Sequence, residues 1–114
     1  MGGTEIGYCF IGDGSNFRYT FARRGDAIVG PYYLIPEMRG HGLASMLICS
    51  GLDDYAPRTG TAWDFIQHNN TASIKTSEIV GFAYYSDCKY SGLLRVLNVC
   101  EYSMGDQQLF CKRG

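Results

Sequence analysis

The segment that most constrains the fold of this chain is the run from Tyr32 to Ala44, with the sequence YYLIPEMRGHGLA. Its first part is apolar and aromatic, as in a strand, and a helical row of apolar side chains begins at Leu43. Gly40 and Gly42 stand between the two. A strand that ends in a glycine loop and continues directly as a helix aims the free amides of the helix start at one point, where they can bind a phosphate. Taken alone, the same pattern is also typical of a tight turn without a ligand.

The flanking sequence predicts further strands and a second helix around this loop. Strands are expected where aromatic and β-branched residues cluster or alternate, and helices where apolar residues recur every three to four positions. The Gly30-Pro31 pair predicts a bend within its strand, because proline cannot donate a ladder hydrogen bond. The expected strands are residues 6–11, 17–22, 27–35, 61–67, 82–85, 93–101 and 107–111, and the expected helices are residues 43–55 and 70–80.

Composition excludes several classes of function. The chain has 114 residues, which fits a single domain, and its 10 Lys and Arg against 11 Asp and Glu leave no basic field for nucleic acid or an anionic membrane. No stretch approaches the roughly 20 apolar residues of a membrane span, and residues 1–7 lack the basic and apolar segments of a leader. These features predict a cytoplasmic protein without nucleic acid or membrane partners.

The cysteines predict neither a metal site nor a redox pair. They are odd in number and scattered, and no two of them form a C-x-x-C motif. We expect them to be buried reduced thiols. They are Cys9, Cys49, Cys88, Cys100 and Cys111.

Two blocks of the sequence resemble the coenzyme A-binding motifs of the GNAT (Gcn5-related N-acetyltransferase) superfamily. Residues 39–44, RGHGLA, match the family signature R/Q-x-x-G-x-G/A that binds the coenzyme A pyrophosphate, and residues 34–38, LIPEM, look like the lead-in that usually precedes it. Residues 70–73, NTAS, followed by Gly81-Phe82, have the spacing of the family's N-x-x-A/S stretch and G-F pair. The resemblance covers residues 27–85 and favours a cofactor site over an isolated turn.

By this resemblance the chain is a single α+β domain, residues 1–114, with a GNAT-like fold. The implied fold is a central mixed, mostly antiparallel sheet of about six or seven strands, with two main helices and a splay between the strands at 27–35 and 61–67. In the family the pantetheine arm of the cofactor inserts into that splay like an additional strand. Family members usually begin with one strand and two helices that build much of the acceptor pocket. This chain is expected to begin at the second strand, as a shortened or partial domain.

The resemblance implies an N-acetyltransferase that uses acetyl-CoA. An acetyl group would pass from the thioester to an amine of a small molecule, an amino sugar or a protein by direct attack. The backbone of 40–44 would hold the pyrophosphate, the backbone near Leu34 would bind the pantetheine and the thioester carbonyl, and Asn70 would contact the cofactor from the other side. The implied cofactor-binding residues are Leu34, Ile35, Arg39, Gly40, His41, Gly42, Leu43, Ala44, Asn70 and Ser73.

The sequence departs from the family at two positions that concern catalysis. In members related to the ribosomal-protein acetyltransferases, a tyrosine four residues before the G-F pair serves as general acid, and here this position is Ser77. A glutamate that often lies five residues before the asparagine is replaced by Phe65, with Asp64 beside it. Because neighbours on a strand face opposite sides, Asp64 is expected to serve only if a bulge shifts the register. Its alternative interpretation is an exposed or capping carboxylate.

Three residues are therefore candidates for acid–base catalysis. An acceptor amine with a pKa near 10.4 must lose a proton before it attacks, and the departing thiolate must gain one. His68, with an ordinary pKa near 6.5 and a place near the mouth of the slot, is the preferred base, and Asp64 is the second candidate. Tyr84 is the candidate that protonates the thiolate. The alternatives are a loop histidine without a role and a tyrosine of the core.

Two other functions remain open at this point. Ser77, Phe65 and the missing front end favour a non-catalytic acyl-CoA-binding or regulatory module, or a fragment of a larger acetyltransferase. A general phosphate-binding domain leaves the block at 70–82 unexplained.

The nine tyrosines, several of them on the expected late strands, allow a homodimer built through the C-terminal sheet.

Overall fold

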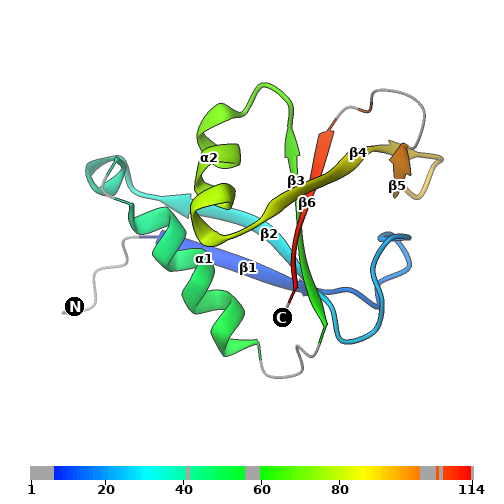
Figure 1. Cartoon of the computed structure of the whole chain (residues 1–114), viewed down its shortest axis with the longest axis horizontal. Helices are drawn as coiled ribbons and strands as arrows, with labels where there is room; N and C mark the ends of the chain where they lie inside the picture. Colours follow the sequence, from blue (N-terminus) through cyan, green and yellow to red (C-terminus); the bar gives the residue numbers. More distant parts are fainter. Residues whose placement is uncertain (1–6, 41, 56–59, 101–104, 106, 114) are drawn as a thin grey trace.

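The computed structural model describes residues 7–40, 42–55, 60–100, 105 and 107–113 (Figure 1). Within these residues the chain forms one mixed sheet, two α-helices and a short 3-10 helix. None of the described helices is both long and apolar enough to cross a membrane. In chain order the elements are β1 (Gly7–Asp13), β2 (Ala27–Leu34), η1 (Pro36–Met38), α1 (Leu43–Asp54), β3 (Thr61–Gln67), α2 (Thr71–Val80), β4 (Ala83–Ser91), β5 (Val96–Cys100) and β6 (Gln107–Arg113).

The six strands are ordered β1-β2-β3-β6-β4-β5 in the sheet. Neighbouring strands are antiparallel except β2 and β3, which run parallel and are joined by α1 as the crossover. The last strand, β6, lies between β3 and β4, so the C-terminal segment completes the middle of the sheet (Figure 1). The predicted architecture, a mixed and mostly antiparallel sheet with two main helices, is confirmed.

The parallel pairing of β2 with β3 is short. Only Ala27–Val29 pair with Ala62–Asp64, and beyond these residues the two strands have no shared ladder. Gly30 and Pro31 follow the last paired residue of β2, and Pro31 cannot donate a ladder hydrogen bond. On the other side of β2, the register with β1 also shifts between Cys9 and Ile11. The predicted bend and splay therefore lie where the sequence places them.

Both α-helices contribute to one hydrophobic core, on one face of the sheet. Ile48 and Leu52 of α1 pack there with Val29 and Ala62, and Val80 ends α2 in the same cluster. The second core lies on the other face and is covered by the loop between β1 and β2, through Tyr19 and Phe21. Its buried members are Ile28, Trp63, Cys88, Leu97 and Leu109.

The strand expected at 17–22 is not formed, and this prediction was wrong. The segment is a series of turns, in which the side chain of Asn16 accepts a hydrogen bond from the Arg18 amide and the Asn16 carbonyl accepts one from the Tyr19 amide. Only an isolated bridge links Tyr19 to Leu97. The alternating aromatic residues serve instead to cover the second core.

Two further expectations need correction. The strand expected from residue 93 begins only at Val96, because Gly92 and Arg95 both have positive φ and form a turn that leaves Leu93 fully exposed. The five cysteines were expected to be buried, but only Cys88 is, and the other four are half-buried.

Candidate active site

The loop before α1 is open to a ligand. Gly40 and Gly42 have φ of +83° and +74°, and a Cβ added at either would meet none of the described atoms within 4 Å. Gly42 is the N-cap of α1, so it has no side chain to cap the helix, and the first turn contains no acidic residue. The amides of Leu43 and Ala44 therefore keep their capacity for an anion. His41, which was predicted to belong to this loop, lies outside the described residues.

A cavity of about 520 Å³ lies at this loop, and we call it the loop cavity. Arg39 is fixed on its rim, since its Nε donates a 2.9 Å hydrogen bond to the Leu34 carbonyl and its guanidinium lies 5.3 Å from the centre of the Tyr33 ring. Lys75 of α2 adds a second positive charge. The predicted residues that line this cavity are Leu34, Arg39, Gly40, Gly42, Leu43, Ala44 and Ser73; Ile35 is not among them.

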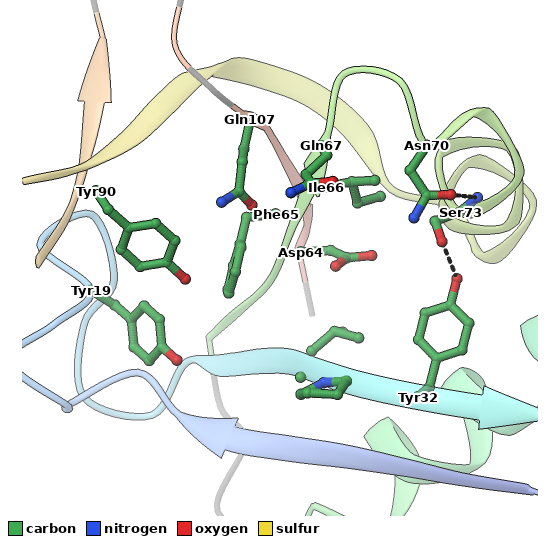
Figure 2. Close-up of a pocket in the computed structure, with 13 residues that line it drawn as sticks. Tyr19, Tyr32, Asp64, Phe65, Ile66, Gln67, Asn70, Ser73, Tyr90 and Gln107 are labelled. Atoms are coloured by element: carbon green, nitrogen blue, oxygen red, sulfur yellow. Dashed lines mark hydrogen bonds between the residues drawn. The ribbon is translucent and has the colours of Figure 1, made fainter. Parts of the chain in front are cut away.

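A second cavity, of about 530 Å³, lies between the diverging parts of β2 and β3, and we call it the slot (Figure 2). Its aromatic end contains Phe65, whose ring centre lies 6.0 Å from that of Tyr19 and 6.2 Å from that of Tyr90. The remaining lining residues are Val29, Gly30, Pro31, Tyr32, Asp64, Ile66, Gln67, Asn70, Ser73 and Gln107.

The slot and the loop cavity meet at Tyr32 and Ser73, the two residues that line both. The hydroxyl of Tyr32 donates a 3.0 Å hydrogen bond to Ser73 Oγ, from β2 across to the first turn of α2 (Figure 2). Asn70, the predicted N-cap, accepts a hydrogen bond from the Ser73 amide through its Oδ1 and also lines the slot. Of the predicted cofactor-binding residues, Ser73 therefore lies at the junction and Asn70 lies beside it.

Asp64 is buried in the slot, and its interpretation as an exposed or capping carboxylate was wrong. Only 5% of the residue is exposed, and its Oδ2 accepts a 2.9 Å hydrogen bond from the Ser77 hydroxyl. Burial raises the pKa of Asp64 to about 7, although the hydrogen bonds from Ser77 and the backbone oppose this shift.

No bulge was needed to bring Asp64 to the slot. The register of β3 with β6 is continuous from Thr61 to Gln67. Asp64 and Phe65 do project on opposite faces, and in Figure 2 the carboxylate points away from the Phe65 ring. Both residues still line one cavity because β2 leaves β3 at this point and opens the strand edge between them.

The other two catalytic candidates lie together at Asp87. His68 Nε2 is 3.3 Å from Asp87 Oδ2, and the Tyr84 hydroxyl donates a 2.8 Å hydrogen bond to Asp87 Oδ1. Burial favours a raised pKa for Asp87, but the hydrogen bonds from Tyr84 and the Gly105 amide and the nearby His68 outweigh it and keep that pKa below its usual value. Neither His68 nor Tyr84 is among the described residues that line the slot or the loop cavity.

Sequence reasoning did not single out Tyr32, and it named Ser77 only as the residue that replaces the family's tyrosine, not as a partner of Asp64. The strand period of two residues and the helix spacing of four residues could have indicated both residues. Tyr32 is two residues before Leu34 on a strand, so both project on one face, and Ser77 is four residues after Ser73, so both lie on one face of the helix. Asp87 had no comparable local signal, because two of its partners, His68 and the Gly105 amide, come from distant parts of the chain.

No family model matches the chain, and no curated protein matches it in sequence. Solved structures do match. The structure of yncA from Salmonella typhimurium with its cofactor acetyl-CoA has a TM-score of 0.66 at 22% identity, over 97% of this chain and 59% of that one. Mycobacterium smegmatis RimJ in complex with CoA-disulfide has a TM-score of 0.64 at 24% identity, over 100% of this chain and 50% of that one.

A third similar structure is described as a member of the GNAT family. It is an acetyltransferase of the GNAT family from Streptococcus pneumoniae, with a TM-score of 0.58 at 15% identity, over 80% of this chain and 52% of that one. The chain thus spans between half and three fifths of the length of these three proteins. The fold of this chain is that of the GNAT acetyltransferases.

Proposed function

We propose that this protein is an N-acetyltransferase, which transfers an acetyl group from acetyl-CoA to an amine of a small molecule, an amino sugar or a protein. The observation that carries the proposal is a pair of adjoining cavities that share Tyr32 and Ser73 as lining residues. One lies at an uncapped helix start, and the other contains a buried carboxylate with a pKa of about 7. An anion site and a base therefore lie on the two sides of the shared residues.

The loop cavity fits the phosphate end of the cofactor. Its first-turn amides are free of a capping side chain, and Gly40 and Gly42 leave room for close approach to the backbone. Arg39 and Lys75 add positive charge on two sides. The solved structures of yncA and RimJ contain acetyl-CoA and a CoA-disulfide, respectively, which supports the same class of ligand here.

Asp64 is the base that we propose for the amine. A group that accepts a proton at neutral pH works best with a pKa near 7, and burial brings the carboxyl of Asp64 to that value. The Ser77 hydroxyl fixes the orientation of the carboxylate. His68, supported by Asp87, remains the second candidate for the base, and Tyr84 remains a candidate acid at the same cluster.

The alternative is a non-catalytic acyl-CoA-binding module or a part of a larger acetyltransferase. The observation that favours it is the coverage of only 50% to 59% of yncA and RimJ. This alternative predicts that acetyl-CoA binds and that no acceptor is acetylated.

The test is a calorimetric titration with acetyl-CoA, followed by incubation with a panel of amines, amino sugars and peptides. Product coenzyme A should be measured by chromatography, because the half-buried cysteines of the protein react with thiol reagents. Binding with release of coenzyme A that depends on an acceptor supports the enzyme. Binding without release supports the binding module, and absence of binding contradicts both.

A further inference from the structure

The reaction proposed above leaves one proton unassigned in the structure. When the acyl carbon is transferred, the sulfur of coenzyme A departs with an electron pair and requires a proton. The donor must reach the path between the phosphate site and the carboxylate. Among the described residues, Tyr32 and Ser73 are the ones that line both cavities on that path.

The hydroxyl groups of Tyr33, Ser45 and Thr76 line the loop cavity but not the slot, and four others near the path are engaged or placed elsewhere. The Ser77 side chain is fully buried and its hydroxyl donates to Asp64. The Tyr84 hydroxyl donates to Asp87, away from the two cavities. Tyr19 and Tyr90 lie at the aromatic end of the slot, beside Phe65, at the opposite end from the junction (Figure 2).

The Tyr32 hydroxyl is held in place by a partner that a ligand can replace. It is half-buried and donates a 3.0 Å hydrogen bond to Ser73 Oγ, where the slot and the loop cavity adjoin. An arm that runs from one cavity to the other must pass this hydrogen bond. A phenol that donates to a neutral serine oxygen gains by donating to an anionic sulfur instead, since charge-assisted hydrogen bonds are about twice as strong.

We propose that Tyr32 is the proton donor to the departing thiolate, an inference that rests on the proposed acetyltransferase function. The amine nitrogen forms a bond to the acyl carbon, the carbon–sulfur bond breaks, and the sulfur takes the proton of the Tyr32 hydroxyl. The nitrogen, which attacks as the neutral amine, loses one proton to the Asp64 carboxylate. That proton returns through solvent to the Tyr32 phenolate, so one proton moves in total from nitrogen to sulfur.

The decisive variant is Tyr32→Phe, with Tyr85→Phe as the matched control and Ser73→Ala as a second variant. Tyr85 lies on β4, is exposed, packs edge-on against Trp63 and lines neither the slot nor the loop cavity. Ser73→Ala removes the partner of Tyr32 and leaves the phenol. We expect Tyr32→Phe to lower kcat by about 10²-fold or more while the Kd of acetyl-CoA stays within about 3-fold, and Tyr85→Phe to retain kcat within about 5-fold.

A second measurement does not depend on turnover. Coenzyme A labelled with ¹³C at the carbon that bears the sulfur is bound to each protein, and the ¹³C shift is followed against pH to obtain the thiol pKa. A hydrogen bond from Tyr32 stabilises the thiolate, so this pKa should be lower in the unchanged protein than in Tyr32→Phe by about one unit. The Tyr85→Phe protein should match the unchanged protein.

The outcomes separate this inference from the proposed function. If the unchanged protein binds coenzyme A and acetylates an amine, but Tyr32→Phe matches it in kcat and in thiol pKa, Tyr32 is not the donor and the proposed function stands. If Ser73→Ala and Tyr32→Phe lose kcat equally with no change in thiol pKa, their hydrogen bond has a structural role only. If the unchanged protein does not bind coenzyme A, both proposals fail.

Discussion

At the scale of single residues, a substitution at Gly42 affects both the proposed anion site and the backbone strain of the loop. Gly42→Glu places a carboxylate at the anion site, so we expect acetyl-CoA binding to be lost. Any side chain at Gly42 is also strained by its φ of +74°. Gly92 has a φ of +75° and equally open surroundings, but lies in the turn after β4 and outside both cavities.

Gly92→Glu is therefore the matched control for Gly42→Glu. It introduces the same charge and a similar strain, and we expect the protein to keep its affinity for acetyl-CoA. Calorimetric titration of the two variants under one set of conditions makes the comparison. Equal affinities in the two variants would show that the loop before α1 does not hold the phosphates.

Asp64 gives a residue-scale prediction for stability against pH. Burial raises its pKa from the ordinary 3.8 to about 7, so between these values the unfolded chain releases a proton that the folded protein keeps. The contribution of Asp64 to the free energy of unfolding is therefore full below pH 4 and declines as pH rises to 7, by on the order of 3–4 kcal/mol. Cys9, the titratable neighbour, has a pKa raised above 9.0 by burial and by Asp64, and stays neutral throughout.

Asp64→Asn should remove this pH dependence, because the amide keeps an oxygen that accepts from Ser77 but carries no charge. The difference in free energy of unfolding between the variant and the unchanged protein should therefore favour the variant more at pH 8 than at pH 5, as measured by urea denaturation. In the acetylation assay we expect a loss of about 10²-fold or more in kcat and of the rise in rate through pH 7. Retained kcat with an unchanged pH profile would transfer the role of base to His68.

At the scale of elements, Asp26 joins the starts of the two strands that form the slot. Its carboxylate accepts hydrogen bonds from Trp63 Nε1 and from the amides of Arg23 and Thr61, each at 2.9 Å. Burial acts to raise the pKa of Asp26, but these hydrogen bonds dominate and lower it. The stability that Asp26 provides is thus present above the ordinary carboxyl pKa and is lost as pH falls through the lowered value.

Asp26→Ala leaves the indole N–H of Trp63 buried without its acceptor, so we expect the free energy of unfolding to fall by about 2–4 kcal/mol. Asp13 provides the control. It begins the same loop, is exposed, and accepts one hydrogen bond from the Ser15 amide. Asp13→Ala should cost about 1 kcal/mol or less in the same denaturation experiment. Equal losses in the two variants would contradict a special role for Asp26.

At the scale of the whole molecule, the sequence predicted best what is decided locally. The second helix ends at Val80, one residue before Gly81, and begins after Asn70, whose side chain caps it as expected. β3 has the predicted bounds, Thr61–Gln67. Caps, breaks and periodicity lie within a few residues of one another, so one sequence suffices to find them.

What the sequence did not predict depends on distant partners. The burial of Asp64 follows from α2, through Ser77, and from the divergence of β2 and β3. The alternating aromatics at 17–22 fit a strand or a covering loop equally well, and the partner, Leu97, is far along the chain. His68, which follows β3, and Tyr84 of β4 lie together only because both contact the Asp87 carboxylate.

Because β2 and β3 pair over only three residues, the rest of each strand has an unpaired edge inside the sheet. An outer edge strand offers unpaired amides and carbonyls to any passing protein and is a liability for aggregation. Here the comparable groups of β2 and β3 face a cavity within the sheet, which is lined by Pro31 and by the hydrogen-bonded pair Tyr32 and Ser73. The extended arm of the proposed cofactor would therefore meet unpaired strand groups inside the sheet, away from its outer edges.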